Sequence, residues 1–289
     1  MSRRRNLEHH RSSLGEIRGI MNSMKTLATM ETHKLARFLD AQRSVVTSIE
    51  SAARDLLAAH PEILPALREQ QPVYLLIGSE RGFCGDFNHA LVRALEARLR
   101  TEDVRQPLLI AVGRKLHTVL ETVGLEAVNI EGASVAEEIP PLLNHLVETI
   151  AAQRAQAGTQ ILTAICHDAE TGVVQRTLLP PFHDLVDTGM AAGQPPLLNR
   201  SPTDLLLSLS EHYLFSRLHE MLYSSLMGEN HYRVAHLEGA VRHLDNESTR
   251  LAHQCNALRQ EEIIEEIEVI LLSSVELAKR SGEHRLDSG

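Results

Sequence analysis

Apolar side chains recur at alternating steps of three and four over the first sixty residues. Eleven of the thirteen positions on this spacing are apolar, and the thirteen are Leu14, Ile17, Met21, Met24, Ala28, Glu31, Leu35, Phe38, Gln42, Val45, Ile49, Ala52 and Leu56. This spacing is typical of a coiled-coil seam. No proline occurs before Pro61, so the pattern predicts one helix over residues 14–60, about 70 Å long.

The last third of the chain repeats the pattern. Its seam comprises Val234, Leu237, Val241, Leu244, Ser248, Leu251, Cys255 and Leu258, and then shifts by one residue to Ile263, Ile267, Ile270, Ser274 and Leu277. No proline follows Pro202, and only Gly228 and Gly239 interrupt the run. A glycine inside a helix costs only about 1 kcal/mol. We therefore predict a second, longer helix over residues 204–280, with bends or close packing at the two glycines.

Between these helices, short apolar runs alternate with amphipathic stretches. The predicted strands cover residues 73–79, 108–113 and 160–166, and the predicted helices cover 88–100, 114–124 and 136–156. Strand and helix in alternation predict a mainly parallel sheet. The stretch 171–182 is expected to add an edge strand, because its prolines would interrupt a central one.

The predicted fold is α+β or α/β: a long antiparallel coiled coil of the N- and C-terminal helices, with an inserted Rossmann-like α/β domain. Neither long helix can bury its single seam alone, so pairing is the economical solution. The expected domains are residues 1–62, 72–196 and 203–282. Opposite charges should face each other across the pair, with Lys25, Lys34 and Arg37 on one helix and Glu261, Glu262, Glu265, Glu266 and Glu268 on the other.

Composition narrows the class of protein. The formal net charge of -9 argues against a general nucleic-acid binder. The three cysteines lie far apart with no C-x-x-C, which is typical of reduced, buried thiols in the cytosol. No run approaches the ~18–20 apolar residues that cross a bilayer. We expect a cytosolic chain that reaches a membrane only through protein contacts.

A glycine-rich loop, "IGSERGFCGDFN" over residues 77–88, lies between a predicted strand and helix. Such loops often bind phosphate on free backbone N–H groups. The spacing, however, fits neither G-x-x-x-x-G-K-[ST] nor G-x-G-x-x-G. Tight turning, with Arg81 pairing locally, is the simpler interpretation. The chain also has no H-E-x-x-H and no G-x-S-x-G, so we predict no catalytic residue, metal site or cofactor.

Three segments together resemble the gamma subunit of F-type ATP synthases. The first is "RSSLGEIRGIMNSMKTLATMETHKLAR", with Lys25-Thr26-Leu27 at the family's Lys-Ala-Met. The second, "SERGFCGDFN", resembles S-D-R-G-L-C-G-x-x-N and matches it at Ser79, Arg81, Gly82, Cys84, Gly85 and Asn88. The third has Glu229 and Arg233 and leads to "ALRQEEIIEEIEVILLSSVEL", which resembles the family's A-R-Q-x-x-I-T-x-E-L ending.

The chain departs from the family pattern at several positions. Arg242 and His243 stand where the family has Asp-Asn, Leu27 replaces a methionine, and Ile264 replaces a threonine. These departures favour a divergent branch, with sodium-motive or alternative-operon F-type enzymes as the candidates.

The resemblance implies a non-catalytic rotor stalk with no cofactor. Arg259 and Gln260 would contact a loop of a catalytic subunit, while Leu27 and the apolar residues Ile267, Val269, Ile270, Leu271 and Leu272 would form a bearing surface. Arg37, Glu229 and Arg233 would dock on the epsilon subunit and the c-ring. The alpha and beta subunits complete the partners. The location would be peripheral, on the cytoplasmic face of a bacterial inner membrane.

Two alternatives remain open from the residues. One is a nucleotide-binding α/β enzyme with helical arms, which would bind ligand at the Gly82–Asn88 loop. The other is a free-standing coiled-coil scaffold, which would form a stable homodimer.

Overall fold

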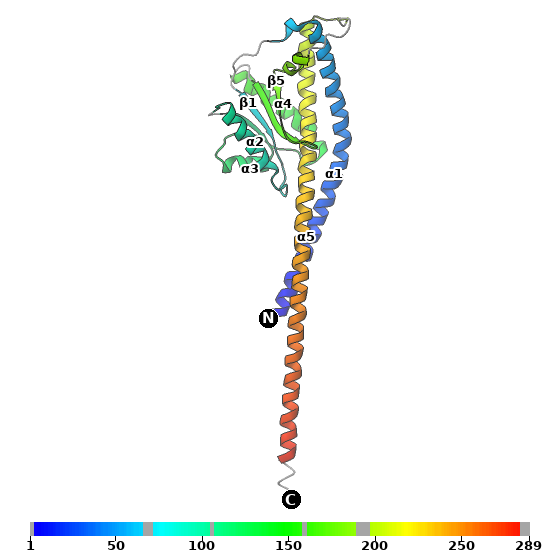
Figure 1. Ribbon diagram of the computed structural model, residues 1–289, viewed down its shortest axis with the longest axis vertical. Helices are drawn as coiled ribbons and strands as arrows, with labels where there is room; N and C mark the ends of the chain where they lie inside the picture. Colours follow the sequence, from blue (N-terminus) through cyan, green and yellow to red (C-terminus); the bar gives the residue numbers. More distant parts are fainter. Residues whose placement is uncertain (1–2, 66–71, 105–106, 158–160, 189–196, 284–289) are drawn as a thin grey trace. The chain divides into compact units, whose positions relative to one another are not determined.

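Two long helices begin and end the folded chain. The structure is a computed structural model that describes residues 3–65, 72–104, 107–157, 161–188 and 197–283. Helix α1 spans Arg3–Ala59 and helix α5 spans Pro202–Glu283 (Figure 1). α1 begins earlier than the predicted residue 14, and α5 continues unbroken through Gly228 and Gly239. None of the helices in the described ranges is long and apolar enough to cross a bilayer.

A five-stranded sheet lies between the two helices in the sequence. Its strands are β1 (Pro72–Ile77), β2 (Leu108–Val112), β3 (Val128–Ile130), β4 (Ile161–Asp168) and β5 (Gly172–Leu179), in the order β3-β2-β1-β4-β5. The pairs β1–β2, β1–β4 and β2–β3 are parallel, and β5 joins β4 antiparallel at the edge. The mainly parallel sheet and the edge strand were predicted. β3 was not, because three residues are too few for a pattern.

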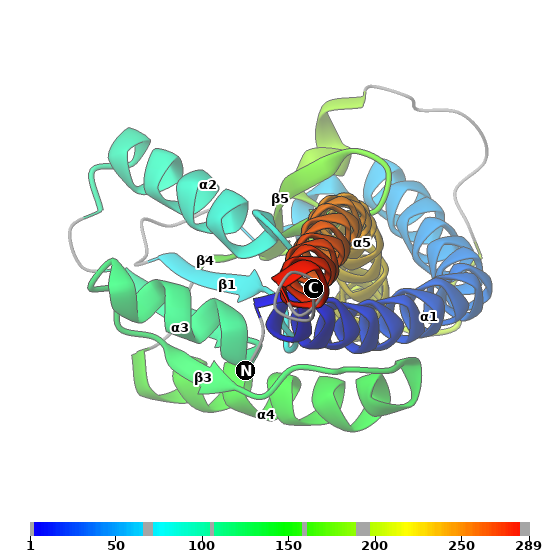
Figure 2. The same cartoon turned by 90° about the horizontal axis from the view of Figure 1, so that it is seen from below.

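Helices cover both faces of this sheet. α2 (Phe87–Thr101) and α3 (Arg114–Thr122) pack on the face that carries Tyr74 and Leu76. α4 (Ile139–Ala157) packs on the opposite face, as Figure 2 shows relative to α2. Leucines of α1 and α5 join α4 in the same core. Three short 3-10 helices complete the elements: Pro61–Ile63, Ala136–Glu138 and His183–Thr188.

The chain divides into two compact units, one of residues 1–24 and 237–289 and the other of residues 25–236. In the larger unit, Phe38 of α1 stacks on Tyr223 of α5 with 5.4 Å between ring centroids, and Glu50 pairs with Arg217. Residue numbers increase along α1 between these two contacts and decrease along α5, so the two helices run antiparallel there.

The smaller unit has the same antiparallel order. Arg4 of α1 pairs with Glu262 of α5 at 3.1 Å, and Arg18 pairs with Asp245 at 2.5 Å. The exposed ion pairs add little stability on their own, but they define which residues of the two helices face each other.

The predicted seam of α5 is buried or half-buried at every position from Val234 to Leu258. Its predicted continuation at Ile263, Ile267, Ile270 and Ser274 is exposed, and Leu277 is a residue whose side chain is not described.

The predicted seam of α1 is only partly right after Leu35. Leu56 is buried and Gln42 and Ile49 are half-buried, as predicted. Leu39, Val46 and Ala53 are also buried, each one residue later than the predicted Phe38, Val45 and Ala52. A straight helix drifts about 20° per heptad against a strict 3.5-residue repeat, so the buried side moves to the next position along the chain.

The predicted facing charges were also wrong. Glu262 contacts Arg4, not the lysines further along α1, and Lys34 contacts Glu137 of the short helix before α4. The reason is register within the smaller unit, where the pairs Arg4–Glu262 and Arg18–Asp245 bring residues near the start of α1, before Lys25, to the acidic part of α5.

Candidate functional site

The glycine-rich loop after β1 is held in place by hydrogen bonds between Ser79 and Asn88, near its two ends. The side-chain oxygen of Asn88 accepts the backbone N–H of Ser79 at 2.9 Å, and its NH2 donates to the Ser79 hydroxyl at 2.8 Å. Phe83 and Gly85 adopt positive φ angles of 63° and 54°. Glycine takes this conformation without strain, which explains one of the motif glycines as a turn residue.

Helix α5 binds the same loop through Glu229 and Arg233. The Glu229 carboxylate accepts the backbone N–H groups of Glu80 at 3.3 Å and Arg81 at 3.4 Å, and it pairs with Arg233. Arg233 also donates from Nε to the Gly82 carbonyl at 3.2 Å. Burial of the Glu229 carboxylate raises its pKa. Glu229 and Arg233 therefore form a buried polar cluster with the backbone of the loop, while Arg81 and Gly85 are exposed.

Cys84 belongs to this cluster as a thiol that stays protonated. Its Sγ lies 3.3 Å from the carbonyl oxygens of Arg81 and Gly82, and Arg233 lies 3.4 Å from it. Burial, followed by the Glu229 charge, raises the pKa of Cys84 to about 11. A nucleophilic or metal-binding cysteine needs the thiolate, so this cysteine is structural.

The side chain of Glu80 binds away from the Glu229 cluster, at the first residue of α3. Its carboxylate accepts the backbone N–H groups of Arg114 at 3.0 Å and Gly132 at 2.8 Å, and pairs with the Arg114 guanidinium. Burial pushes the pKa of this carboxyl upward, but the two N–H groups and the guanidinium outweigh it and lower the pKa overall. Glu80 is therefore charged at neutral pH.

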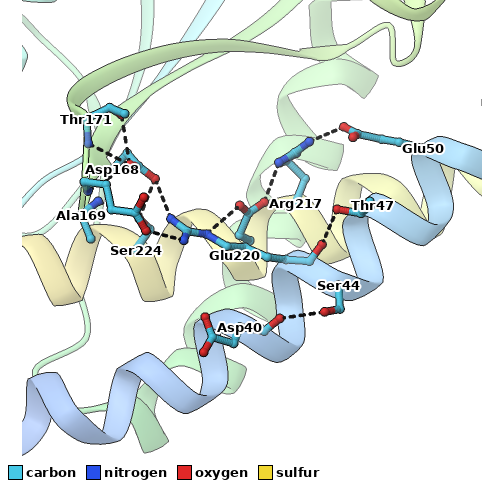
Figure 3. A network of polar contacts seen from close by, with 12 residues as sticks. Asp40, Ser44, Thr47, Glu50, Asp168, Ala169, Thr171, Arg217, Glu220 and Ser224 are labelled. Carbon is cyan, nitrogen blue, oxygen red and sulfur yellow. Dashed lines mark hydrogen bonds and ion pairs between the residues drawn. The ribbon is translucent and has the colours of Figure 1, made fainter.

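A second polar network joins α1 to the turn between β4 and β5 (Figure 3). Arg43 of α1 donates to Asp168 at 3.2 Å and to Glu170 at 2.7 Å. Asp168 also accepts the backbone N–H groups of Glu170 and Thr171, both at 3.0 Å. Burial pushes the pKa of Asp168 upward, but these N–H groups and Arg43 keep it below its usual range.

The network continues along α5 (Figure 3). Arg217 pairs with Glu220 at 2.6 Å and with Glu50 of α1. Its guanidinium lies 5.4 Å from the centre of the Tyr213 ring. Nothing in the sequence indicated this network, since the three segments that form it carry ordinary charged residues with no spacing in common.

The residues expected to face catalytic partners lie on the surface of α5. Arg259 and Gln260 are exposed. Further along, the predicted bearing residues Ile267, Ile270 and Leu271 are 51%, 64% and 59% exposed, and Val269 and Leu272 are exposed as well. Leu27 is also exposed, but it belongs to the larger compact unit.

The residues expected to dock on epsilon and the c-ring divide into two kinds. Arg37 is exposed. Glu229 and Arg233 retain only 2% and 5% of their surface, so the expectation that their side chains contact a partner directly needs correction. Their charged groups bind the loop and each other inside the molecule. The sequence motif alone could not show whether these residues bind within the chain or at an interface with a partner.

The structure offers no metal site in the ranges it describes, where no group of three or more candidate ligands comes together. A cavity of about 750 Å³ opens near the first residues of β1 and β4. Four of its charged side chains form two ion pairs, Arg98 with Glu102 at 2.5 Å and Arg217 with Glu50. This cavity shares no residue with the motif loop.

A comparison with known protein families covers all three parts of the chain, the two long helices and the sheet between them. The family model described as ATP synthase matches residues 3–274, which include both long helices and the sheet. The chain therefore belongs to the family of ATP synthase gamma chains.

Two relatives illustrate the extent of the likeness. The ATP synthase gamma chain of Pelotomaculum thermopropionicum is 24% identical over 277 residues, covering 92% of this chain and 96% of the relative. That of Moorella thermoacetica is 26% identical over 280 residues, with the same coverage.

A solved structure has the same fold. A chain in the central stalk and c-ring of the Tetrahymena thermophila mitochondrial ATP synthase aligns with a TM-score of 0.56 at 19% identity. The alignment covers 76% of this chain and 99% of that one.

Proposed function

We propose that this chain is the central rotor stalk of an F-type ATP synthase. It couples ion-driven rotation of a membrane ring to ATP synthesis or hydrolysis in a head of alpha and beta subunits. The observation that carries the proposal is the family match across residues 3–274, which spans the shaft helices and the insert together. A match to the sheet alone would have left the enzyme alternative standing, and a match to the helices alone would have left the scaffold.

The shaft of this rotor is an antiparallel coiled coil of the first and last regions, 1–62 and 203–282, with a Rossmann-like insert at 72–196. The predicted end of the insert at residue 196 lies outside the described residues. The antiparallel ion pairs Arg4–Glu262 and Glu50–Arg217, one in each compact unit, support the pairing. Because the two helices differ in length and side chains, such a shaft is asymmetric and presses each surrounding catalytic site differently at any angle.

The far end of α5 turns inside the head. Arg4 of α1 meets Glu262, and the apolar side chains that follow on α5 in the stretch 263–272 are exposed. These exposed aliphatic side chains suit a sleeve of partner subunits. Arg259 and Gln260, just before them, form directed hydrogen bonds to a loop of one catalytic subunit. Leu27 contributes to the bearing surface from α1.

The insert and the neighbouring helix segments dock on the epsilon subunit and the c-ring, with Arg37 among the contacting residues. The motif loop with Arg81, Gly82, Cys84 and Gly85 serves this end indirectly. Glu229 and Arg233 hold it against α5, so that the insert and the helix turn as one body.

The chain itself forms and breaks no bond. Its protonated Cys84 and the internally paired carboxylates Glu80 and Glu229 support a non-catalytic role. It lies peripherally on the cytoplasmic face of a bacterial inner membrane and touches the membrane only through the complex.

Affinity purification of the tagged full-length chain from its own cells tests the proposal. Alpha, beta and epsilon subunits and the c-ring are expected to co-purify in fixed ratio, and an untagged strain serves as the control. Recovery of the chain as a homodimer without these subunits would favour the scaffold. Micromolar binding of ATP or ADP by the purified chain in calorimetry would favour the enzyme.

Arg259→Ala and Gln260→Ala are each expected to lower the ATPase turnover of the assembled complex about tenfold. A lost charge-assisted or directed hydrogen bond costs ~1.5 kcal/mol, which corresponds to this factor in rate. Circular dichroism should show the shaft still folded. Arg242→Ala and Gln254→Ala, exposed residues of the same types on the same helix, are the matched controls. Equal turnover in all four variants would mean that Arg259 and Gln260 are ordinary exposed residues with no specific role in turnover.

A further inference from the structure

The sheet has a crevice of the kind that binds ligands in other α/β folds. In the order β3-β2-β1-β4-β5, the chain moves one way from β1 through β2 to β3 and then returns to place β4 on the other side of β1. Open parallel sheets bind their ligands beyond the carboxyl ends of the strands at such a reversal. Here those ends are Ile77 of β1 and Asp168 of β4.

Helix α5 lies directly across this position. The Ser225 hydroxyl donates to the Ile77 carbonyl at 3.0 Å, and the Ser224 hydroxyl accepts the backbone N–H of Ala169 at 3.2 Å. A Cβ on Gly228 would stand 3.3 Å from the Cβ of His167 on β4. The small side chains of α5 at these positions are what allow its backbone to approach the strand ends so closely.

The loop after β1 presents its backbone donors to this helix. The N–H groups of the successive residues Glu80 and Arg81 point at one carboxylate, that of Glu229. Successive N–H groups of this kind form a concave anion-binding nest. Arg233 adds a cationic donor to the same carboxylate, as an arginine does for a bound phosphate or carboxylate in many sites.

A neighbouring backbone N–H donor is also hydrogen-bonded to a carboxylate of the chain. The backbone N–H at the start of α3, on Arg114, is the position where a doubly wound fold offers a helix N-terminus to an anion. It is bound by the Glu80 carboxylate. Two carboxylates of the chain therefore occupy the donors that surround the strand ends.

We propose that Glu229 is a built-in anion, which fills the crevice in the place of a bound phosphate and makes α5 the permanent ligand of the insert. The glycine-rich loop is an anion-binding loop after all, with its anion supplied by the same chain. The inference rests on the contacts of the loop and stands whether or not the rotor assignment is correct.

Chemical rescue of Glu229→Ala in the full-length chain tests this inference. The substitution removes the two carbons and two oxygens of an acetate ion, and leaves Arg233 buried without its partner. The melting temperature is expected to fall by about 5–15 °C. Sodium acetate should then raise it by about 2–5 °C over sodium chloride at the same sodium concentration, because a ligand of the folded state stabilises by mass action.

Two controls separate anion binding from general salt effects. Acetamide, which has the shape of acetate without its charge, should not rescue Glu229→Ala. Glu211→Ala, an exposed glutamate on the same helix, should melt like the wild type and respond equally to acetate and chloride. Loss of stability in Glu229→Ala with no preference for acetate would overturn the proposal.

Glu229→Gln decides the matter if the alanine variant yields no folded chain in either salt. Its amide would turn an NH2 group toward N–H donors, so the variant should melt well below the matched Glu211→Gln and show no acetate response, because the site is still filled. A Glu229→Gln chain as stable as Glu211→Gln would mean that no anion is required there.

Discussion

Replacing Gly113 with alanine is expected to lower the free energy of unfolding by about 2–5 kcal/mol, through backbone strain and overpacking together. Gly113 lies between β2 and α3, as the N-cap of α3, with φ 108° and ψ 124°, a conformation that other residues rarely adopt. A Cβ here would lie 2.6 Å from the Ser79 carbonyl oxygen. The obstacle is backbone at the base of the motif loop, so no side chain can rotate away to relieve it. Urea unfolding of the full-length variant measures the loss.

Gly124→Ala is the control that separates the two causes. Gly124 also has a positive φ, of 75°, but nothing lies within 4 Å of the position that a Cβ would take. Strain alone should therefore cost this variant about 1 kcal/mol. If Gly113→Ala were no less stable than Gly124→Ala, the close approach of Gly113 to the loop would have no energetic weight.

Arg217→Ala is expected to destabilise the larger compact unit by about 3 kcal/mol. Removing one member of a buried ion pair costs ~3–5 kcal/mol because the remaining charge is left without compensation. The lower end applies, since Glu50 keeps 26% of its side chain exposed and can regain water. Glu220, 12% exposed, cannot. Denaturant unfolding followed by circular dichroism measures the change.

Arg250→Ala is the matched control, because Arg250 and Glu247 also pair three residues apart on α5. That arginine is 65% exposed, so its loss should cost no more than ~1 kcal/mol. Adding Glu220→Gln to Arg217→Ala should recover part of the stability, because it removes a nearly buried carboxylate whose remaining cationic partner, Arg43, lies 3.9 Å away. A double variant less stable than Arg217→Ala would contradict this account.

Periodicity predicted most of the architecture, because long helices and buried strands carry their signal locally. The seam of α5 and the parallel strands after Pro72 and Leu108 follow directly from it. The shift of the α1 seam from Phe38 to Leu39 could not be read from a fixed 3–4 spacing, since the drift accumulates over the whole helix. β3 was too short to leave a pattern.

The candidate site was only partly predictable. The motif identified Glu229 and Arg233, but not the direction in which their side chains point. Arg43 and Asp168 left no signal at all, because 125 residues separate them and their pairing depends on tertiary packing. Charge complementarity between Lys34 and the glutamates of residues 261–268 was a poor guide, because opposite charges are common on helix surfaces, whereas register is determined by the apolar contacts.

The position of the insert between the two long helices has a consequence for how the protein is made. Glu50 and its partner Arg217 are separated by 167 residues. A ribosome adds about 5–20 residues per second, so α1 exists for roughly 10–30 s before the segment of α5 that covers it has been synthesised. During that interval the side chains of Leu35 and Leu39 have no α5 to pack on. The pairing of α1 with α5 can therefore form only after most of the chain has been synthesised, which makes it a late event in the folding of this protein.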